Sequence, residues 1–573
     1  MMTETTTQET DLLFQHFATL ATGPDGIARL RELILQLAVQ GKLGTQDPGD
    51  EPAGFLMDRI NLKKARLDIK TRKKTQNDFP PFSDEDSPFH IPNNWIWTQL
   101  GELFEITSSK RIHESDWKSS GIPFLRAREI VSLLKGEVFS SPIFISEELY
   151  EKVKLQTGVP EPNDILVTGV GTVGIPYIVT GKEKFYFKDG NVVWLKNSFS
   201  IYAKFIELVV KSPYISNVIN ETHGTTVKTF TIIKAKSLVI PLPPLAEQHR
   251  IVEKVDRLMA LCDELERQQQ QERSTCLRLG TASFAGLQNA ESPGEFGGQW
   301  AQICDTFDLM LDCPENVAVL RQTILHLAVQ GKLGTQNERD EPASVLSKKI
   351  LDEKKKLQKQ GIISRSRSFP EITSEEKTYA IPKKWLWLRL DDIGHNWGQK
   401  EPNNSFTYID VAAIDNKKGE IGDYVDVLLP DEAPSRARKL VRKGTLIYST
   451  VRPYLLNIAI IEKEFNPEPI VSTAFAVLHP FEGISNRYLF YYLRSKPFIA
   501  YVESQMKGMA YPAINDQKFH MGLIPVPPTA EQHRIVEKVD RLMALCDQLE
   551  AQLKGRAGVQ ERFAKAVVGG ITP

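Results

Sequence analysis

The chain has 573 residues, of which 41% are apolar and 25% are charged, as in ordinary globular proteins, and this length allows three or four domains. The net charge of −1 excludes a global attraction to nucleic acid or membrane, so any basic surface must be local. The five cysteines include no CxxC pair, which argues against a disulfide framework or a zinc site. No run approaches the length of a membrane span and the N-terminus is polar and acidic, so we expect a cytoplasmic protein.

The chain opens with a segment that is helical by its apolar periodicity, over about residues 11–39, with a break near 23–25. It ends in LAVQGKLGTQ (37–46), where Gly41 is a suitable C-terminal cap. The same ten residues return at 327–336, and DEPA (50–53) returns at 340–343. A second helix is predicted after each DEPA. The repeat defines a helical arm that occurs twice.

Each arm is followed by a proline-tryptophan segment, IPNNWIW at 91–97 and IPKKWLW at 381–387. The segments that come next differ in sequence; we call residues 98–240 the first body and residues 388–524 the second body. Both read as short β-strands with a few helices towards their ends. A repeated frame that carries two unlike bodies indicates a scaffold with two different recognition surfaces.

After each body comes AEQHRIVEKVDRLMALCD, copied without change at 246–263 and 530–547. Apolar residues in each copy follow heptad spacing, Ile251, Val255, Leu258, Cys262 and Leu265 in the first. Each copy therefore predicts a long helix, about 60 Å in length if it runs from about 245 to about 288. We expect the other copy to be its partner in an antiparallel pair, which would relate the two bodies by a pseudo-twofold axis.

The expected fold is α+β, with two globular α/β domains separated by long paired helices and with an internal repeat. The expected domains are an N-terminal helical arm (1–93), a first domain (94–243), a central region with a long helix and the repeated arm (244–384), a second domain (385–527) and a C-terminal long helix (528–573).

Some motifs that signal chemistry elsewhere are not supported by their surroundings. Gly169, Gly171 and Gly174 form GxGxxG after a strand, but the segment that follows reads as strands instead of the helix that a dinucleotide site needs, so a glycine-rich turn is favoured. His249 and His533 lie in the first turn of a helix, where a structural role is favoured. The sequence offers no nucleophile, base and orienting group in a recognisable set.

The layout resembles the specificity subunit of a type I DNA restriction-modification enzyme, in which two target-recognition domains alternate with conserved helical regions. The resemblance covers nearly the whole chain. It is carried by PLPPLAEQHRIVEKV (241–255), PVPPTAEQHRIVEKV (525–539), the twin LAVQGKL blocks, GTTVKTFT (224–231), STVRPYLLNIA (449–459) and GMAYPAI (508–514).

The resemblance implies a non-catalytic, double-stranded-DNA-binding subunit that holds two modification (methyltransferase) subunits and, with them, restriction subunits. Each recognition domain would bind one half of a bipartite, asymmetric site. No cofactor is expected in this chain, because S-adenosylmethionine, ATP and Mg would belong to the partner subunits. A stand-alone DNA-binding regulator and a protein scaffold unrelated to DNA remain as alternatives.

Residues that could read bases or hold phosphates are arginines, lysines, hydroxyl residues and tyrosines in the quoted motifs and near them. In the first domain these candidates are Lys110, Arg111, Arg126, Arg128, Thr225, Thr226 and Lys228. In the second domain they are Ser435, Arg436, Arg438, Lys439, Arg452, Tyr454 and Tyr511. The candidate partner surface is the apolar face of the twin arm helices, at Leu37, Val39, Leu327 and Val329, although packing within the subunit explains these residues equally well.

Overall fold

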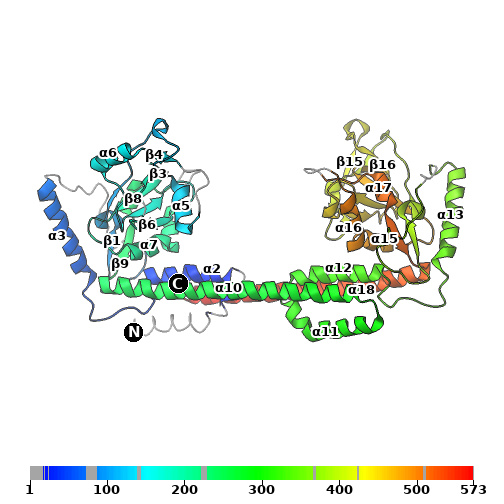
Figure 1. The fold of residues 1–573 in the computed structure, drawn as a ribbon, viewed down its shortest axis with the longest axis horizontal. Coiled ribbons are helices and arrows are strands. Elements are labelled where there is room, and N and C mark those ends of the chain that lie inside the picture. The colour runs from blue at the N-terminus through cyan, green and yellow to red at the C-terminus, as the bar shows by residue number, and fades with distance from the viewer. Residues whose placement is uncertain are drawn as a thin grey trace. The chain divides into compact units, whose positions relative to one another are not determined.

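A computed structural model describes residues 17, 20–23, 25–71, 87–137, 143–182, 184–220, 229–364, 369–422, 425–507 and 512–571. The chain divides into two compact units, unit 1 with Met1–Gln270 and Arg556–Pro573, and unit 2 with Gln271–Gly555. The expected fold class is confirmed, because helix and sheet are mixed and two domains are linked by a long helix, α10 (Leu245–Asn289) (Figure 1). None of the helices described is long and apolar enough to span a membrane.

The repeated arm consists of helices, as predicted. Unit 1 contains α2 (Gly26–Val39) and α3 (Ala53–Thr71), and unit 2 contains α11 (Pro293–Leu311), α12 (Glu315–Val329) and α13 (Ala343–Lys359). Gly41 ends α2 in the left-handed region with φ of 70°, and the N–H of Lys42 donates to the Leu37 carbonyl at 2.9 Å. Gly331 ends α12 in the same way, with φ of 72°. The predicted glycine cap is confirmed in both repeats.

The heptad seam of each long helix packs against the arm helix of its own unit. Ile251, Val255 and Cys262 of α10 lie in one buried cluster with Ile34 and Leu37 of α2. In unit 2 the copied seam on α18 (Thr529–Ile571) lies in one buried cluster with residues of α12. Ion pairs flank both contacts, from Arg31 to Asp263 at 2.6 Å and from Arg321 to Asp547 at 2.6 Å.

The expectation that each seam pairs with the other long helix was therefore wrong for these residues. The arm helix has its own apolar face and is held beside α10 by the loop that follows it, where Lys254 donates to the Leu43 carbonyl. This hydrogen bond adds to the apolar contact and stabilises the arm helix as the partner of the seam. The relative direction of the two long helices stays a prediction.

The first body and its flanking strands are a mixed α/β domain. Its elements in chain order are β1 (Ile96–Gln99), α4 (Leu100–Leu103), β2 (Glu105–Thr107), η2 (Glu114–Asp116), β3 (Ile122–Leu125), α5 (Ala127–Lys135), β4 (Phe144–Ile145), α6 (Glu147–Thr157), β5 (Ile165–Thr168), β6 (Pro176–Ile178), β7 (Tyr186–Phe187), β8 (Val192–Lys196), α7 (Ala203–Lys211), α8 (Pro213–Asn220), α9 (Ile232–Ser237) and β9 (Val239–Leu242).

The second body and its flanking strands are built in the same style. Their elements are β10 (Leu386–Arg389), α14 (Leu390–Ile393), β11 (Gly394–His395), β12 (Phe406–Ile409), η3 (Val411–Ala413), β13 (Ile414–Asp415), β14 (Glu420–Ile421), β15 (Asp426–Leu428), η4 (Pro430–Glu432), β16 (Ala437–Leu440), β17 (Leu446–Ser449), η5 (Pro453–Leu455), β18 (Ile458–Ile460), β19 (Pro469–Ser472), β20 (Phe475–Pro480), α15 (Asn486–Leu493), α16 (Lys496–Gln505), α17 (Asp516–Met521) and β21 (Leu523–Val526).

The two bodies have the same strand connections although their sequences differ. The antiparallel sheet β2-β8-β5-β6 of the first body corresponds to β11-β20-β17-β18 of the second. The parallel pair β3–β7, with β4 antiparallel beside β3, corresponds to β12–β19 with β15 beside β12. The second body adds β16 next to β19 and the small pair β13–β14. One topology therefore supports two different surfaces.

Each body is closed at its base by its first and last strands. β1 pairs antiparallel with β9 in the register Ile96↔Leu242, and β10 pairs with β21 in the matching register Leu386↔Val526. The chain therefore enters and leaves each body at one point, directly before a long helix.

A buried glutamate at the start of each long helix joins this base to the arm. Glu247 accepts a hydrogen bond from Trp95 Nε1 at 2.8 Å and one from Thr45 Oγ1 at 3.0 Å. Glu531 accepts the same bonds from Trp385 and Thr335, at 2.8 and 3.0 Å. These donors come from the repeated WxW and GKLGT segments. The residues that recur in the sequence are thus those that meet at the junction of arm, body and long helix.

An arginine one turn further on strengthens the same junction. Arg250 Nε donates to the Thr45 carbonyl at 2.9 Å and its guanidinium pairs with Asp50 of DEPA, and Arg534 repeats both contacts with Thr335 and Asp340. Burial raises the pKa of Glu247, and hydrogen bonds from Trp95 and Thr45 offset part of that rise.

We predict that Glu247→Ala lowers the free energy of unfolding of the chain by about 2–4 kcal/mol, because it leaves two buried donors without an acceptor. Chemical denaturation followed by circular dichroism measures the change. Glu253→Ala is the control on the same helix, where the carboxylate is exposed and pairs with Arg257. Equal effects of the two substitutions would contradict the role given to the junction.

A partly buried histidine in the second body has a lowered pKa. His479 on β20 lies 3.0 Å from Thr445 Oγ1 through Nδ1, and its ring centroid is 5.3 Å from that of His395. Burial, followed by the charges of His395 and Arg442, lowers the pKa of His479 from 6.5 to about 4. Between pH 6.5 and about 4, the unfolded chain therefore binds a proton on His479 that the folded chain does not bind.

We predict that unit 2 loses stability as the pH falls from 6.5 towards 4, because only the unfolded state gains this proton. The thermal unfolding midpoint, measured across this range, should fall more steeply for the wild-type chain than for His479→Gln. Parallel curves for the two chains would contradict the assignment to His479, since acidic groups titrate in both.

Candidate nucleic-acid interface

The loop between β17 and β18 of the second body combines an unusual backbone conformation with exposed large side chains. Arg452 and Leu456 flank the short helix η5 with φ of 47° and 54°, in the left-handed region that side chains with a Cβ rarely adopt. Tyr454 between them is 46% exposed and Leu455 is 42% exposed. A loop that is strained and yet displays large side chains to solvent is typical of a binding surface.

Backbone contacts hold this loop against the segment before α17. The N–H of Arg452 donates to the Pro512 carbonyl at 2.9 Å, and the N–H of Ile514 donates to the Thr450 carbonyl at 2.9 Å. Asn515 then caps α17 by accepting from the N–H of Lys518. The motif STVRPYLLNIA and residues 512–514 at the end of GMAYPAI, far apart in sequence, are thus brought side by side.

The glycine-rich loop of the first body occupies the corresponding place. It joins β5 to β6, as β17 is joined to β18, and Phe230 donates its N–H to the Gly169 carbonyl at 3.0 Å, as Ile514 does to Thr450. Gly171 and Gly174 have φ of 80° and 82°. The prediction of a turn between strands is confirmed, and no helix opens there to receive a dinucleotide.

Two candidate arginines of the first body are oriented by a buried carboxylate. Arg126 precedes α5, and Glu129 in its first turn accepts from Arg126 Nε at 3.0 Å and from Arg128 Nε at 2.6 Å. Burial alone would raise the pKa of Glu129, but the bonds from Arg126 and Arg128 outweigh it and hold this pKa below its ordinary value. Arg128 remains exposed, so its guanidinium is held in place and still accessible.

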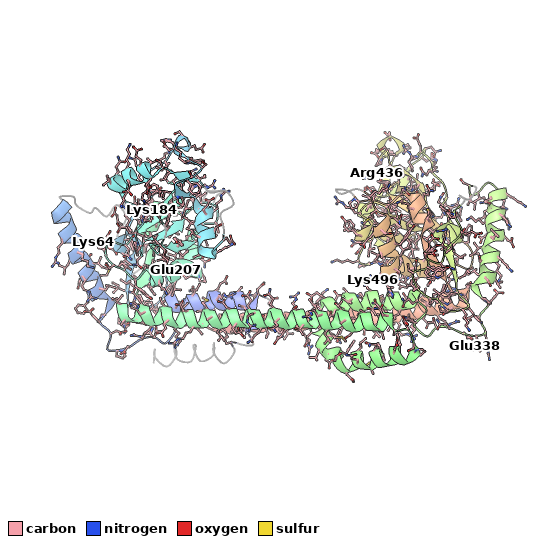
Figure 2. The ribbon with its side chains drawn as sticks, viewed as in Figure 1. Lys64, Lys184, Glu207, Glu338, Arg436 and Lys496 are labelled. Carbon is pink, nitrogen blue, oxygen red and sulfur yellow. The ribbon has the colours of Figure 1, made fainter. Side chains whose placement is uncertain are left out.

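The second body presents its candidate arginines beside β16. Arg436 pairs with Asp410 at 2.7 Å, and Arg438 pairs with Glu401 at 3.1 Å. Ser435 is exposed next to them. Figure 2 shows Arg436 at the end of the second body away from α12. The sequence analysis did not predict the acidic residues that orient these arginines. Only the Arg-x-x-Glu spacing at 126–129 could have indicated one of them.

Lys439 does not belong to an accessible surface, contrary to our prediction. Only 6% of the residue is exposed, and its Nζ donates to the Phe475 carbonyl at 2.6 Å and to Asp516. Along β16, Ala437 and Lys439 are buried and Arg438 between them is partly exposed. Its charge is neutralised inside the body.

The remaining candidates fall into two groups. Lys110 and Arg111 are exposed in the first body, where the N–H of Lys110 donates to the Tyr186 hydroxyl at 2.7 Å and fixes the loop. Thr225, Thr226, Lys228 and Tyr511 lie outside the described residues.

The proposed partner surface on the arm helices was also wrong. Leu37, Val39 and Val329 have no exposed surface and Leu327 is 5% exposed, each inside a cluster of its own unit. The apolar faces of α2 and α12 are covered by the seams of the long helices and by the bodies.

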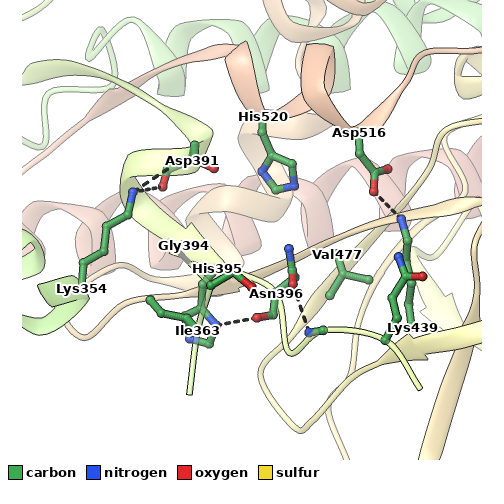
Figure 3. A pocket seen from close by; sticks show the side chains of 13 residues that line it. Lys354, Ile363, Asp391, Gly394, His395, Asn396, Lys439, Val477, Asp516 and His520 are labelled. Atoms are coloured by element: carbon green, nitrogen blue, oxygen red, sulfur yellow. Dashed lines mark hydrogen bonds and ion pairs between the residues drawn. The ribbon is translucent and has the colours of Figure 1, made fainter. Parts of the chain in front are cut away.

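A polar cavity of about 300 Å³ lies beside β16 in unit 2 (Figure 3). Lys354 and Lys439 in its wall are paired with Asp391 and Asp516, so charge is balanced within the lining. In the part of the chain that the structure describes, no group of three or more His, Cys, Asp or Glu residues could hold a metal ion.

Two bodies of one topology, each presenting a loop and oriented arginines from a repeated frame, define a double recognition module. The family model of the type I restriction modification DNA specificity domain matches the chain twice, over residues 92–273 and 382–556. The chain belongs to this family, and the resemblance found in its motifs is confirmed.

Relatives match along nearly the whole length. The chain is 31% identical to the type I restriction enzyme EcoAI specificity subunit of Escherichia coli, over 95% of this chain and 93% of that one. It is 28% identical to the EcoEI specificity subunit of the same species, with the same coverage. The crystal structure of the HsdS subunit from Thermoanaerobacter tengcongensis is similar over 84% of this chain and 98% of that one, with 18% identity and a TM-score of 0.39.

We predict that Arg452→Val is less stable than Arg452→Gly by about 1–2 kcal/mol, because only glycine adopts the left-handed φ without strain. The difference in unfolding free energy between the two variants measures it. Tyr454→Val and Tyr454→Gly form the matched pair at an exposed position of the same loop. A glycine variant as unstable as the valine variant would contradict the strain at this residue.

Proposed function

We propose that this chain is the DNA sequence-recognition subunit of a type I restriction-modification complex, with residues 94–243 and 385–527 as its two recognition domains. The observation that carries the proposal is that one topology presents different side chains at corresponding loops, glycines after β5 and Arg452 with Tyr454 after β17. Two unlike heads read two different half-sites, so the target is bipartite and asymmetric.

Chemistry of the oriented arginines supports this reading. A guanidinium held by a carboxylate on one edge keeps further N–H groups for a guanine edge or a phosphate. Arg128, Arg436 and Arg438 are all held in this way. Preorientation lowers the entropy lost when the side chain contacts DNA.

Catalysis belongs to the partners in this proposal. Two modification subunits methylate adenine at N6 in each half-site with S-adenosylmethionine, after the base is turned out of the duplex. Restriction subunits add ATP- and Mg-dependent cleavage. The names of the relatives, specificity subunits of restriction enzymes, support such an assembly.

The test is base-resolved mapping of N6-methyladenine in a host without background methylation. The chain is expressed together with its modification subunit, beside a control that lacks the chain. We expect one gapped, asymmetric motif methylated on both strands and absent from the control. Methylation that is the same with and without the chain, although the modification subunit is assembled, would return the stand-alone regulator and the protein scaffold as explanations.

Substitutions then assign the half-sites. We predict that Arg452→Ala lowers methylation of the whole motif at limiting enzyme and relaxes base preference only in one half-site, and that Arg128→Ala does so in the other half-site. Loss of one good base contact costs about 1–3 kcal/mol in discrimination. Arg541→Ala, an exposed arginine on α18, is the control and should leave the motif unchanged. Relaxation in the same half-site for both variants would contradict the division between the bodies.

A further inference from the structure

The second helix of the repeated arm is strongly basic in unit 2. α13 contains six lysines and two acidic residues among 17 residues, within a chain of net charge −1. Two of these lysines have internal partners, since Lys354 is buried on Asp391 and Lys349 pairs with Glu341 at 2.8 Å. Lys355, Lys356 and Lys359, which we call the lysine cluster, are exposed at the C-terminal end of the helix.

α13 is fixed along the side of the second body (Figure 1). Lys354 Nζ donates to the Asp391 carbonyl at 2.8 Å, and Glu353 accepts the N–H of Glu482 at 3.0 Å. These contacts lie one to six residues before the lysine cluster. The cluster is therefore carried on a helix whose position relative to the body is set.

The chain that leaves α13 reaches the candidate interface. Ile363 and Ser364 line the polar cavity together with Gln399 and Lys439, as Figure 3 shows for Ile363 and Lys439. Lys400, the residue after Gln399, donates its N–H to the Arg438 carbonyl at 3.0 Å. The residues that follow α13 thus share a cavity with β16, the strand that carries Arg438 and directly follows Arg436.

The other arm repeats the sign of the charge without repeating the residues. α3 carries two arginines and three lysines against two aspartates, AGFLMDRINLKKARLDIKT, and packs on the first body, where Lys63 Nζ donates to the Phe199 carbonyl at 3.3 Å. Lysines near a helix C-terminus also stabilise the helix dipole, which explains one or two such residues. A basic helix at the same place beside both bodies points to an external anion.

We propose that the lysine cluster of α13 contacts the phosphate backbone of duplex DNA beyond the bases that the second body reads. The arm then acts as a sequence-independent extension of the recognition domain. Ammonium groups on flexible stems suit phosphates and carry no base preference. This inference rests on the proposed function, since it places the arm on the same duplex as the second body.

Salt dependence of binding is the direct readout. The full chain, assembled with its modification subunits, is titrated with a duplex that carries the mapped motif, at several salt concentrations. Lys355→Gln with Lys359→Gln should lower the slope of log K against log salt by about 1–2, because each phosphate contact contributes about 0.9. Lys348→Gln with Lys349→Gln removes the same charge from the other end of α13 and should leave the slope close to that of the wild type.

A second arm of the experiment tests position. On a duplex trimmed at the border of the half-site read by the second body, the wild type and the Lys355/Lys359 variant should bind with equal slopes. Both variants should methylate the same motif as the wild type. A wild-type slope for the Lys355/Lys359 variant, an equal loss in the Lys348/Lys349 control, or a difference that persists on the trimmed duplex would overturn the inference.

These outcomes are separable from failure of the proposed function. If the chain directed no motif, mapping would show that first, whatever the slopes. If the motif is found and the slopes do not differ, only the role of α13 is refuted.

Discussion

The structure depends on one buried carboxylate at the start of each long helix. Glu247 and Glu531 each take a tryptophan N–H from the entry to a body and a threonine hydroxyl from the arm. A buried charge is tolerated only where hydrogen bonds replace its water, so arm, body and helix must all be in place together. The same junction therefore forms twice in the chain, and the parts of the bodies outside it are free to differ.

The repeated helices of the frame could be predicted from the sequence. Exact copies at 246–263 and 530–547, together with the glycine caps, predict long helices and an internal repeat. The partner of the heptad seam could not be read in this way, because α2 and the other long helix offer equally suitable apolar faces. What decides is the hydrogen-bonded loop from Gly41 to Thr45, whose contacts are made only in the folded chain.

The bodies were predictable in kind but not in detail. GVGTVG and VRPYLL share no pattern, yet both connect the third and fourth strands of corresponding sheets and both are tied to the segment before a short helix. The glycines reach positive φ at no cost, whereas Arg452 and Leu456 reach it under strain. Lys439 shows the limit of residue type as a guide: a strand turns alternate residues inwards, and an ion pair with Asp516 makes the inward lysine acceptable.

The frame and the bodies have different roles. The frame residues recur because they form the same junction of arm, body and long helix twice. The bodies differ because each binds a different target. The strand pairs β1–β9 and β10–β21 have matching registers, so both bodies are closed at the base in the same way.

In the most direct measurement, residues 98–240 are replaced by residues 388–524, so that the chain carries the second body twice. The methylated motif of the assembled complex is then mapped. We predict a gapped motif in which both halves are the half-site of the second body. A hybrid that folds and assembles but still methylates the original asymmetric motif would contradict the claim that the bodies, and not the frame, choose the sequence.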